Sequence, residues 1–151
     1  MKKFWANTLK LVFLSFLALS MMGCSFAPKP IEIGKDLCEW CKMTIMEKRF
    51  GAEIITSKGK IYKFDSIECL IRYIHQFPPS EYPVKSLLVI DHSNPGEFIE
   101  AEKAFYLHSE KLPSPMGANL TAVQNQETID EYSTTYGGEI WTWNEACRQL
   151  E

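Results

Sequence analysis

The sequence contains no long run of lysine and arginine, and its 151 residues include only three histidines. A chain with a formal net charge of −3 and no basic cluster is unsuited to nucleic acid, so we expect no nucleic-acid partner. A Ser-His-Asp set, a pair of catalytic carboxylates and a glycine-rich phosphate loop are also lacking. These absences exclude the commonest enzyme signatures.

The composition is otherwise that of an ordinary globular protein. Hydrophobic residues make up 46% of the chain, charged residues 23% and aromatic residues 13%. Disordered chains have a lower hydrophobic content and a higher charge. We therefore expect one small folded domain with a modest core.

The chain also lacks an uninterrupted apolar run long enough to span a bilayer comfortably. The apolar stretch 9–22 contains a lysine and two serines and follows a basic start, which is the layout of a secretory signal. It ends in Gly23-Cys24, which is typical of a bacterial lipobox. We predict a signal peptide over residues 1–23 and an acylated Cys24 that anchors the protein to the extracytoplasmic face of a bacterial membrane. Simple secretion with a free Cys24 and an uncleaved anchor are the alternatives.

The remaining chain is acidic, because residues 1–23 contain three lysines and no acidic residue, and residues 24–151 therefore carry a net charge of −6. Residues 24–35 include two prolines and are predicted to form a short tether. The folded domain is predicted over residues 36–151.

Hydrophobic patterning predicts an α+β fold. Short β-prone segments are separated by turn residues, and two segments carry apolar residues at helical spacing. The first helix is predicted to begin at a capping box formed by Asp65 and Glu68, and the second is predicted between Asn125 and Gly137. The predicted strands are 51–56, 61–64, 86–90, 98–101, 104–107 and 139–143, and the first helix covers 66–76.

The second half of the chain repeats the pattern of the first. Residues 117–123 are similar to residues 51–56, and a helix is predicted in each half. We therefore predict two weakly repeated β-β-α-β units in one small domain.

Five cysteines in an exported chain require an explanation. Cys38 and Cys41 form a C-x-x-C motif, which alone is compatible with a redox pair, half of a metal site or a local disulfide. Zinc would require a second pair, and a thioredoxin-type site would be followed by a long helix rather than β-prone sequence. Met43 adds a thioether, and this set of soft donors favours Cu(I). A core-filling role for Met43 is the alternative.

Met116 is a second candidate thioether ligand. It lies in the loop 113–117, where two prolines restrict the backbone. If the repeat is aligned as above, Met43 and Met116 precede equivalent strands and converge on one site.

The other sulfur and imidazole groups have weaker patterns. Cys69 lies in the first predicted helix on the flank of its apolar face, and we interpret it as a small half-buried side chain. Cys147 has no accompanying motif. His108 is interpreted as a surface residue, with a role as a further metal ligand as the alternative.

Together, these motifs resemble the NosL family, lipoproteins associated with nitrous oxide reductase maturation. In many members a glycine stands at the position of Lys42. The resemblance extends from about Asp36 to Trp143 and rests on the lipobox Cys24, Cys38-x-x-Cys41-x-Met43-x-Ile45, Arg49-Phe50-x-Ala52-Glu53-Ile54, Gly59-Lys60-x-Tyr62-x-Phe64-Asp65-Ser66-Ile67-Glu68-Cys69-Leu70 and Pro115-Met116-Gly117.

The resemblance implies an extracytoplasmic protein that binds Cu(I) and delivers it to nitrous oxide reductase together with membrane-associated assembly partners. It implies that the copper ligands are Cys38, Cys41, Met43 and Met116. It also implies two β-β-α-β units related to the organomercurial lyase fold. A copper carrier of this kind is not an enzyme.

Two alternatives belong to other classes of protein. The first is a thiol enzyme, in which Cys38 and Cys41 form a redox pair, or in which Asp65 and Cys69 belong to a site like that of the organomercurial lyases. The second is a structural lipoprotein in which Cys38 and Cys41 form a disulfide.

The lipobox generates the first testable prediction. Mass spectrometry of the membrane fraction should show acyl chains on Cys24 as the first residue of the mature protein. These chains would hold the protein at the membrane, because each buried CH₂ contributes about 0.8 kcal/mol to membrane binding. Cys24→Ala should move the protein to the soluble fraction, whereas Cys147→Ser, the matched control, should remain membrane-bound. A soluble parent protein with an unmodified Cys24 would contradict the prediction.

Overall fold

The computed structural model of the chain describes residues 27–80 and 82–150. The predicted signal peptide 1–23 and the predicted lipid site Cys24 lie outside these residues. None of the helices in the described ranges has the length and apolar character needed to cross a membrane. The elements are β1 (Ala52–Thr56), β2 (Ile61–Phe64), α2 (Ile67–Gln76), β3 (Val84–Ile90), β4 (Phe98–Glu100), η1 (Ala101–Lys103), β5 (Phe105–His108), β6 (Leu120–Val123), α3 (Gln126–Tyr136), β7 (Glu139–Trp141) and α4 (Trp143–Gln149).

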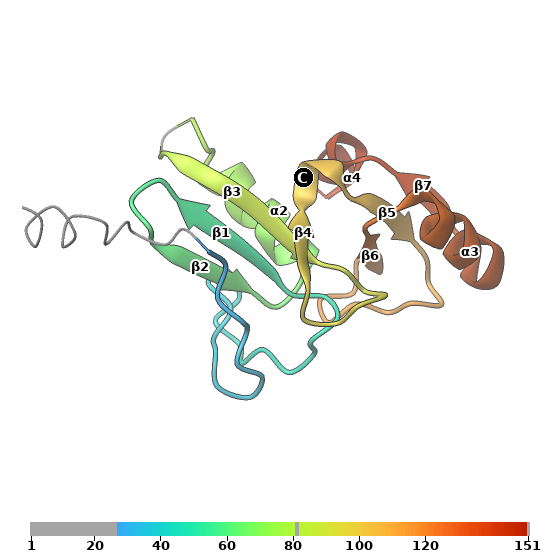
Figure 1. The fold of residues 1–151 in the computed structure, drawn as a ribbon, viewed down its shortest axis with the longest axis horizontal. Coiled ribbons are helices and arrows are strands. Elements are labelled where there is room, and N and C mark those ends of the chain that lie inside the picture. Colours follow the sequence, from blue (N-terminus) through green and yellow to red (C-terminus); the bar gives the residue numbers. More distant parts are fainter. Residues whose placement is uncertain (1–26, 81, 151) are drawn as a thin grey trace, which may run out of the picture.

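Two antiparallel sheets with the same local topology form the two halves of the molecule (Figure 1). The first sheet has the strand order β2-β1-β3-β4 and the second has the order β6-β5-β7. In each half the first strand is central, the second strand pairs on one side of it, and the strand after the helix pairs on the other. This arrangement confirms the predicted α+β class and the two β-β-α-β units.

The alignment that we predicted between the two units is wrong by one strand. Residues 117–123 lead into β6, which occupies the place of β2, whereas the counterpart of β1 is β5. Met43 therefore precedes the first strand of its unit and Met116 precedes the second strand of the other unit. The two methionines do not precede equivalent strands, so that argument for their convergence is withdrawn.

The first helix begins as predicted near residue 66, but its cap differs from the predicted one. Ser66, and not Asp65, is the N-cap residue, and its side chain accepts the N–H of Cys69. Glu68 does not reach back to the cap, because its carboxylate accepts a hydrogen bond from Ser114 instead. A serine directly after Asp65 offers the same cap chemistry one residue later.

The C-terminal end also differs from the prediction. The last strand ends at Trp141, and residues 143–149 form the helix α4. Thr142 and Glu145 make a capping box at its start, with the Thr142 N–H donating to Glu145 Oε2 at 2.7 Å. This S/T-x-x-E signal was readable in the sequence.

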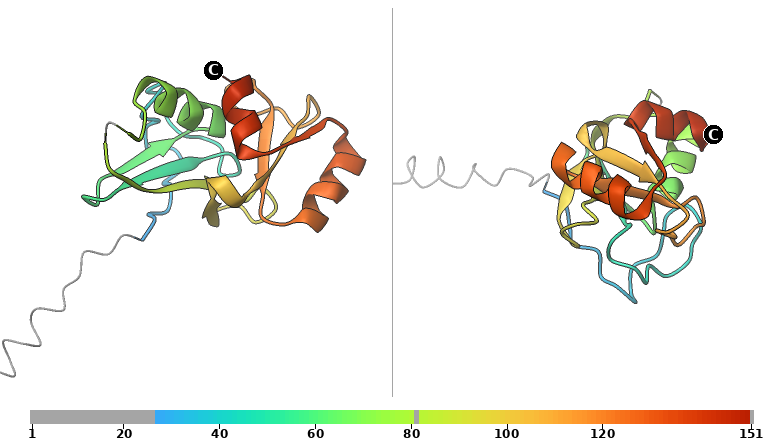
Figure 2. Two further views of the ribbon diagram at one scale, coloured as in Figure 1. Left: turned by 90° about the horizontal axis from the view of Figure 1, so that it is seen from above. Right: turned by 90° about the vertical axis from the view of Figure 1, so that its right-hand side faces the viewer.

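The main core lies between the two sheets and the helices α2 and α4. One cluster of buried residues includes members of both sheets, α2 and α4, and a smaller cluster of four residues lies between β5, β6 and α3. The alternation of a β-strand explains the division, since Tyr106 of β5 faces the main core and Leu107 faces α3. Figure 2 shows α2 and α4 on one face of the molecule, with α3 at the far end of the second sheet.

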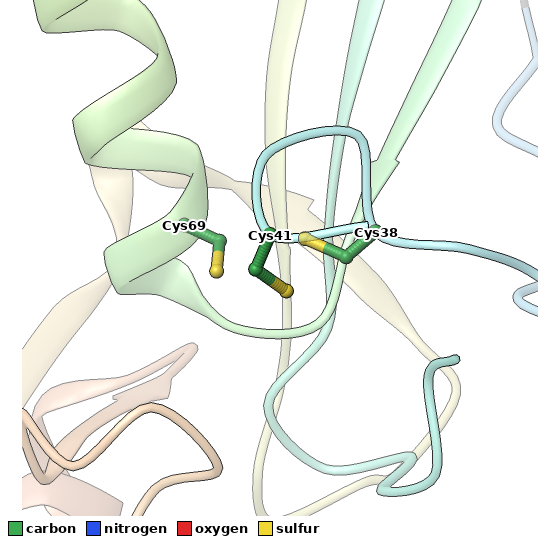
Figure 3. A group of neighbouring side chains, drawn as sticks. All are labelled: Cys38, Cys41 and Cys69. Atoms are coloured by element: carbon green, nitrogen blue, oxygen red, sulfur yellow. The ribbon is translucent and has the colours of Figure 1, made fainter. Parts of the chain in front are cut away.

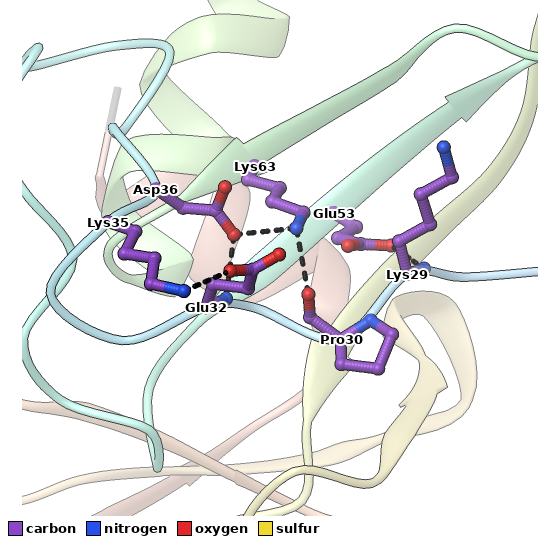
Figure 4. Close-up of polar contacts among 7 residues, drawn as sticks. All are labelled: Lys29, Pro30, Glu32, Lys35, Asp36, Glu53 and Lys63. Carbon is purple, nitrogen blue, oxygen red and sulfur yellow. Dashed lines mark hydrogen bonds and ion pairs between the residues drawn. The ribbon is translucent and has the colours of Figure 1, made fainter.

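The segment that we predicted to be a tether is docked on the first sheet (Figure 4). Lys63 Nζ of β2 lies 2.6 Å from Asp36 Oδ2 and 2.8 Å from the carbonyl oxygen of Pro30. The N–H of Lys29 donates to Glu53 Oε2 of β1 at 3.2 Å. Lys29 and Pro30 of the predicted tether therefore contact the first sheet.

Glu53, the second residue of β1, carries a fully buried carboxyl group. Its Oε1 atom has no hydrogen-bond partner among the described residues. Burial raises the pKa of Glu53 to about 7, against the opposing effect of the Lys29 N–H. The folded protein thus retains a proton that the unfolded chain releases near pH 4.5.

This carboxyl group generates a pH-dependent prediction. As pH rises from about 4.5 to about 7, the free energy of unfolding should fall by roughly 1–3 kcal/mol, because ionised Glu53 is penalised only in the folded state. Glu53→Gln should remove most of this loss and be more stable than the parent at pH 8. Urea unfolding of each protein at pH 5 and pH 8 measures this change in the free energy of unfolding. Glu32→Gln is the control, because Glu32 is in an exposed ion pair with Lys35. Parallel losses of stability in parent and Glu53→Gln would contradict the prediction.

Candidate metal centre

Three cysteine thiols meet at the N-terminal end of α2 (Figure 3). Cys38 and Cys41 come from the loop before β1, and Cys69 comes from the first turn of α2. Their three Sγ atoms all lie within 4.8 Å of one another. Among the described residues, this is the one group of three or more cysteine, histidine, aspartate or glutamate side chains close enough to share a metal ion.

A short hairpin holds Cys38 and Cys41 in this position. The N–H of Cys38 donates to the carbonyl of Met43 at 2.8 Å, and the Cys38 carbonyl accepts the N–H of Lys42 at 3.0 Å. Lys42 has a φ of 61°, in the left-handed region where glycine is the least strained residue. A glycine, which the resemblance associates with this position, would relieve that strain. This turn places the Cys41 sulfur within 4.8 Å of the Cys38 sulfur.

The start of α2 positions Cys69. Ser66 caps the helix and accepts the Cys69 N–H at 3.4 Å, so the cysteine lies in the first turn. Its side chain is fully buried, and the half-buried flank position that we predicted is wrong. The helix is covered on more than its apolar stripe, since the five residues Ile67–Ile71 are all buried.

The electrostatics of the cluster favour one thiolate at Cys38. Hydrogen bonding from the Cys69 thiol holds the pKa of Cys38 well below its usual value, with further donation from the N–H groups of Asp65 and Cys41. The same interactions raise the pKa of Cys69, and burial raises the pKa of Cys41. These opposite shifts make Cys38 the thiol of the cluster that loses its proton most readily.

Asp65, which we predicted as the helix cap, does not cap α2 and instead lies near the thiol cluster. Its side chain is buried, and burial together with the negative charge of Cys38 raises its pKa. The backbone N–H of Met46 donates to its carboxylate and opposes this effect. The carboxyl group thus stands beside the thiol cluster.

The cluster has the donor chemistry and spacing of a soft-metal site. Sulfur atoms bound tetrahedrally to one ion at about 2.3 Å lie about 3.8 Å apart, so small side-chain rotations bring these three sulfurs to bonding distance. Thiolates select Cu(I), zinc and iron–sulfur clusters over hard cations.

The two methionines that we predicted as ligands lie in different surroundings. Met43 is 49% exposed, at the surface of the hairpin that carries Cys38 and Cys41. Met116 is half-buried and packs against the main core cluster, which includes Cys38 and Cys69. Their roles as ligands stay predictions. Met46, two residues after the hairpin, is 68% exposed.

His108 and Cys147 lie outside the three-thiol group. The ring of His108 stacks on Trp141 with centroids 4.5 Å apart, so His108 has a structural role in the second sheet. Cys147 is half-buried in α4, and burial raises its pKa to about 11. Its carbonyl oxygen lies 2.9 Å from Nε2 of His75 and thereby links α4 to α2.

Comparison with known proteins agrees with this architecture. The sequence profile of the NosL family matches residues 30–150. The chain belongs to the NosL family. A solved structure, the crystal structure of the copper chaperone NosL from Shewanella denitrificans, is similar in fold with a TM-score of 0.66 at 23% sequence identity. The match covers 80% of this chain and 96% of that chain. Among proteins of curated function, none matches.

Cys69 is the member of the three-thiol group that the sequence analysis did not assign to the metal site. Its signal was available, because it follows the helix cap by three residues and so lies in the first turn, at the end of α2 where the chain arrives from β2. A thiol in the first turn of α2 can contact a loop that packs against the N-terminal end of the helix.

The geometry predicts three metal-bound thiolates. Titration of the reduced full-length protein with Cd(II), a soft probe, should give an ultraviolet sulfur-to-metal charge-transfer band equivalent to three thiolates, because all three sulfurs converge. Cys69→Ser should reduce the band by about a third, and Cys147→Ser should leave it unchanged. An unchanged band in Cys69→Ser would exclude Cys69 from the centre.

Proposed function

We propose that this protein is an extracytoplasmic lipoprotein that binds Cu(I) and delivers it during maturation of nitrous oxide reductase. The observation that carries the proposal is the group of three thiols, Cys38, Cys41 and Cys69, at the junction of the hairpin and α2. Membership of the NosL family and the fold shared with a copper chaperone support it. Copper is here the cargo of the protein, and no catalytic step is assigned to it.

Cu(I) fits this donor set for reasons of charge and softness. The ion has a filled d shell and is satisfied by two to four soft ligands, so a site of thiolates and thioethers suits it better than oxygen-preferring ions. The lowered pKa of Cys38 supplies one negative charge before the metal arrives. Binding then releases protons from the remaining thiols.

The exposed side of the site supports transfer of the ion. Cys41 and Met43 are partly exposed, so a partner can approach the metal from the hairpin side. Three large apolar side chains are exposed on this hairpin or just after it, namely Leu37, Met43 and Met46. Such a surface suits docking of another protein. Copper passes by stepwise exchange of one sulfur ligand for a donor of the acceptor.

The predicted lipid at Cys24 would hold the domain at the membrane. Between Cys24 and the docked Lys29 lie only four residues, which span at most about 18 Å when extended. The copper site would therefore work close to the bilayer, where membrane-bound assembly partners of the reductase are reached without diffusion into bulk solvent.

A thiol enzyme similar to the organomercurial lyases is a second candidate, favoured by the position of Asp65. Two thiols, Cys38 and Cys69, and a carboxyl group with a raised pKa lie together. Such a set could transfer a proton to the carbon of a carbon–mercury bond while the thiolates take the released Hg(II). Incubation with methylmercury tests it, because catalytic release of methane would favour the enzyme and its absence would favour the carrier. The four cysteines that the structure describes are free thiols.

The copper proposal predicts the choice of metal. Under reducing conditions the full-length protein should bind about one Cu(I) in competition with a Cu(I)-specific chelator, and excess Zn(II) should not displace it. Cys38→Ser and Cys41→Ser should weaken binding strongly, because each removes a charged donor. Displacement of copper by zinc would contradict the assigned donor set.

The predicted thioether ligand has its own test. Met116→Ala should weaken Cu(I) binding less than Cys38→Ser does, because a thioether supplies a lone pair without charge. Met46→Ala is the matched control, since Met46 is largely exposed, and it should keep the affinity of the parent. Chelator competition measures both, with circular dichroism to verify folding. Parent-like affinity in folded Met116→Ala would remove Met116 from the ligand set.

A further inference from the structure

The proline-containing loop of the second unit is tied to the helix that carries Cys69. Glu68, the second residue of α2, accepts a hydrogen bond from the hydroxyl group of Ser114, 46 residues further along the chain. Both side chains are buried. Carboxylates are rarely buried unless they are paired, and this hydrogen bond attaches the loop to the helix.

Ser114 also determines the shape of the loop itself. Its Oγ atom accepts the N–H of Asn119 at 2.8 Å, and its carbonyl accepts the N–H of Gly117 at 3.1 Å. Asn119 and Gly117 have φ values of 54° and 79°, so the chain turns sharply at both positions. Met116 lies inside this turn and packs against the core cluster that contains the buried site cysteines.

The stability of the folded protein does not explain why a carboxylate occupies position 68. The Oε2 atom of Glu68 is buried without a hydrogen-bond partner among the residues that the structure describes, which destabilises the folded protein. An apolar side chain of similar size would avoid this cost. Since Glu68 is adjacent to Cys69, the same helical turn carries a thiol of the metal site and the attachment point of the loop that presents Met116.

We propose that Glu68 and Ser114 are positioning residues that hold the thioether of Met116 beside the thiol cluster, so that copper takes ligands from both units. This inference rests on the proposed copper function and extends it. Neither residue touches the metal. Without their bond the loop gains conformational freedom that it must lose again when copper binds, and Met116 then contributes less to affinity.

A double-mutant cycle tests the inference on the full-length protein. Ser114→Ala should weaken Cu(I) binding by about tenfold, as is usual for groups that orient metal ligands. In a Met116→Ala background, the same substitution should cost less than about twofold, because the ligand it positions is already absent. Ser114→Thr, which keeps the hydroxyl group, should restore most of the affinity.

A matched control separates positioning from general damage. Ser109 is another buried serine of the second unit, and its hydroxyl group donates to the Tyr136 carbonyl at 3.1 Å. Ser109→Ala should leave Cu(I) affinity within about twofold of the parent, since its partner is in α3 rather than α2.

A second variant guards against loss of folding. The double variant Glu68→Leu with Ser114→Ala removes both partners of the hydrogen bond. It therefore leaves no buried carboxylate without its Ser114 donor. We expect this variant to fold and to lose as much Cu(I) affinity as Ser114→Ala. Parent-like affinity in this variant, or equal losses from Ser114→Ala with and without Met116, would overturn the inference. Failure of the parent to bind Cu(I) would instead contradict the proposed function.

Discussion

The buried sulfur of Cys38 can carry a negative charge only because three parts of the chain surround it with donors. The thiol of Cys69 reaches it from α2, the N–H of Asp65 from the end of β2, and the N–H of Cys41 from its own hairpin. Removing any of these donors would leave a negative charge on Cys38 with less compensation in the core. The hairpin, the first sheet and the helix must therefore stay packed together, and the same packing brings three sulfurs within reach of one ion.

The two-unit architecture gives this site a second supporting half. The cysteines of the cluster all belong to the first unit and its N-terminal hairpin, whereas the second unit supplies core side chains and the loop around Met116. The units are joined by shared core residues and by the N–H of His92, which follows β3 and donates to the Ala122 carbonyl of β6 at 2.9 Å. In this arrangement a ligand contributed by the loop would link metal binding to the contact between the units.

Much of the fold could be predicted because its strands alternate and its helices have clear caps. The strands β1 and β2 and the helix after Asn125 lie within a residue or two of their predicted positions. Cys69 could not be placed correctly from helical periodicity, which assumes one buried face, whereas the five consecutive residues Ile67–Ile71 of α2 are all buried. The alignment of the repeat failed because local sequence similarity between β1 and β6 concealed the topological equivalence of β1 and β5. Contacts such as Glu68 with Ser114 join distant residues, so no local pattern in the chain indicates them.

X-ray absorption at the copper edge of the Cu(I)-loaded, reduced protein tests the central claim most directly. The account predicts a first coordination shell of sulfur alone in the parent and in Cys147→Ser, and a loss of one sulfur neighbour when Cys69 is replaced by serine. A shell dominated by nitrogen or oxygen, or a sulfur count that Cys69→Ser leaves unchanged while Cys147→Ser lowers it, would contradict the assignment of the Cys38, Cys41 and Cys69 cluster as the metal centre.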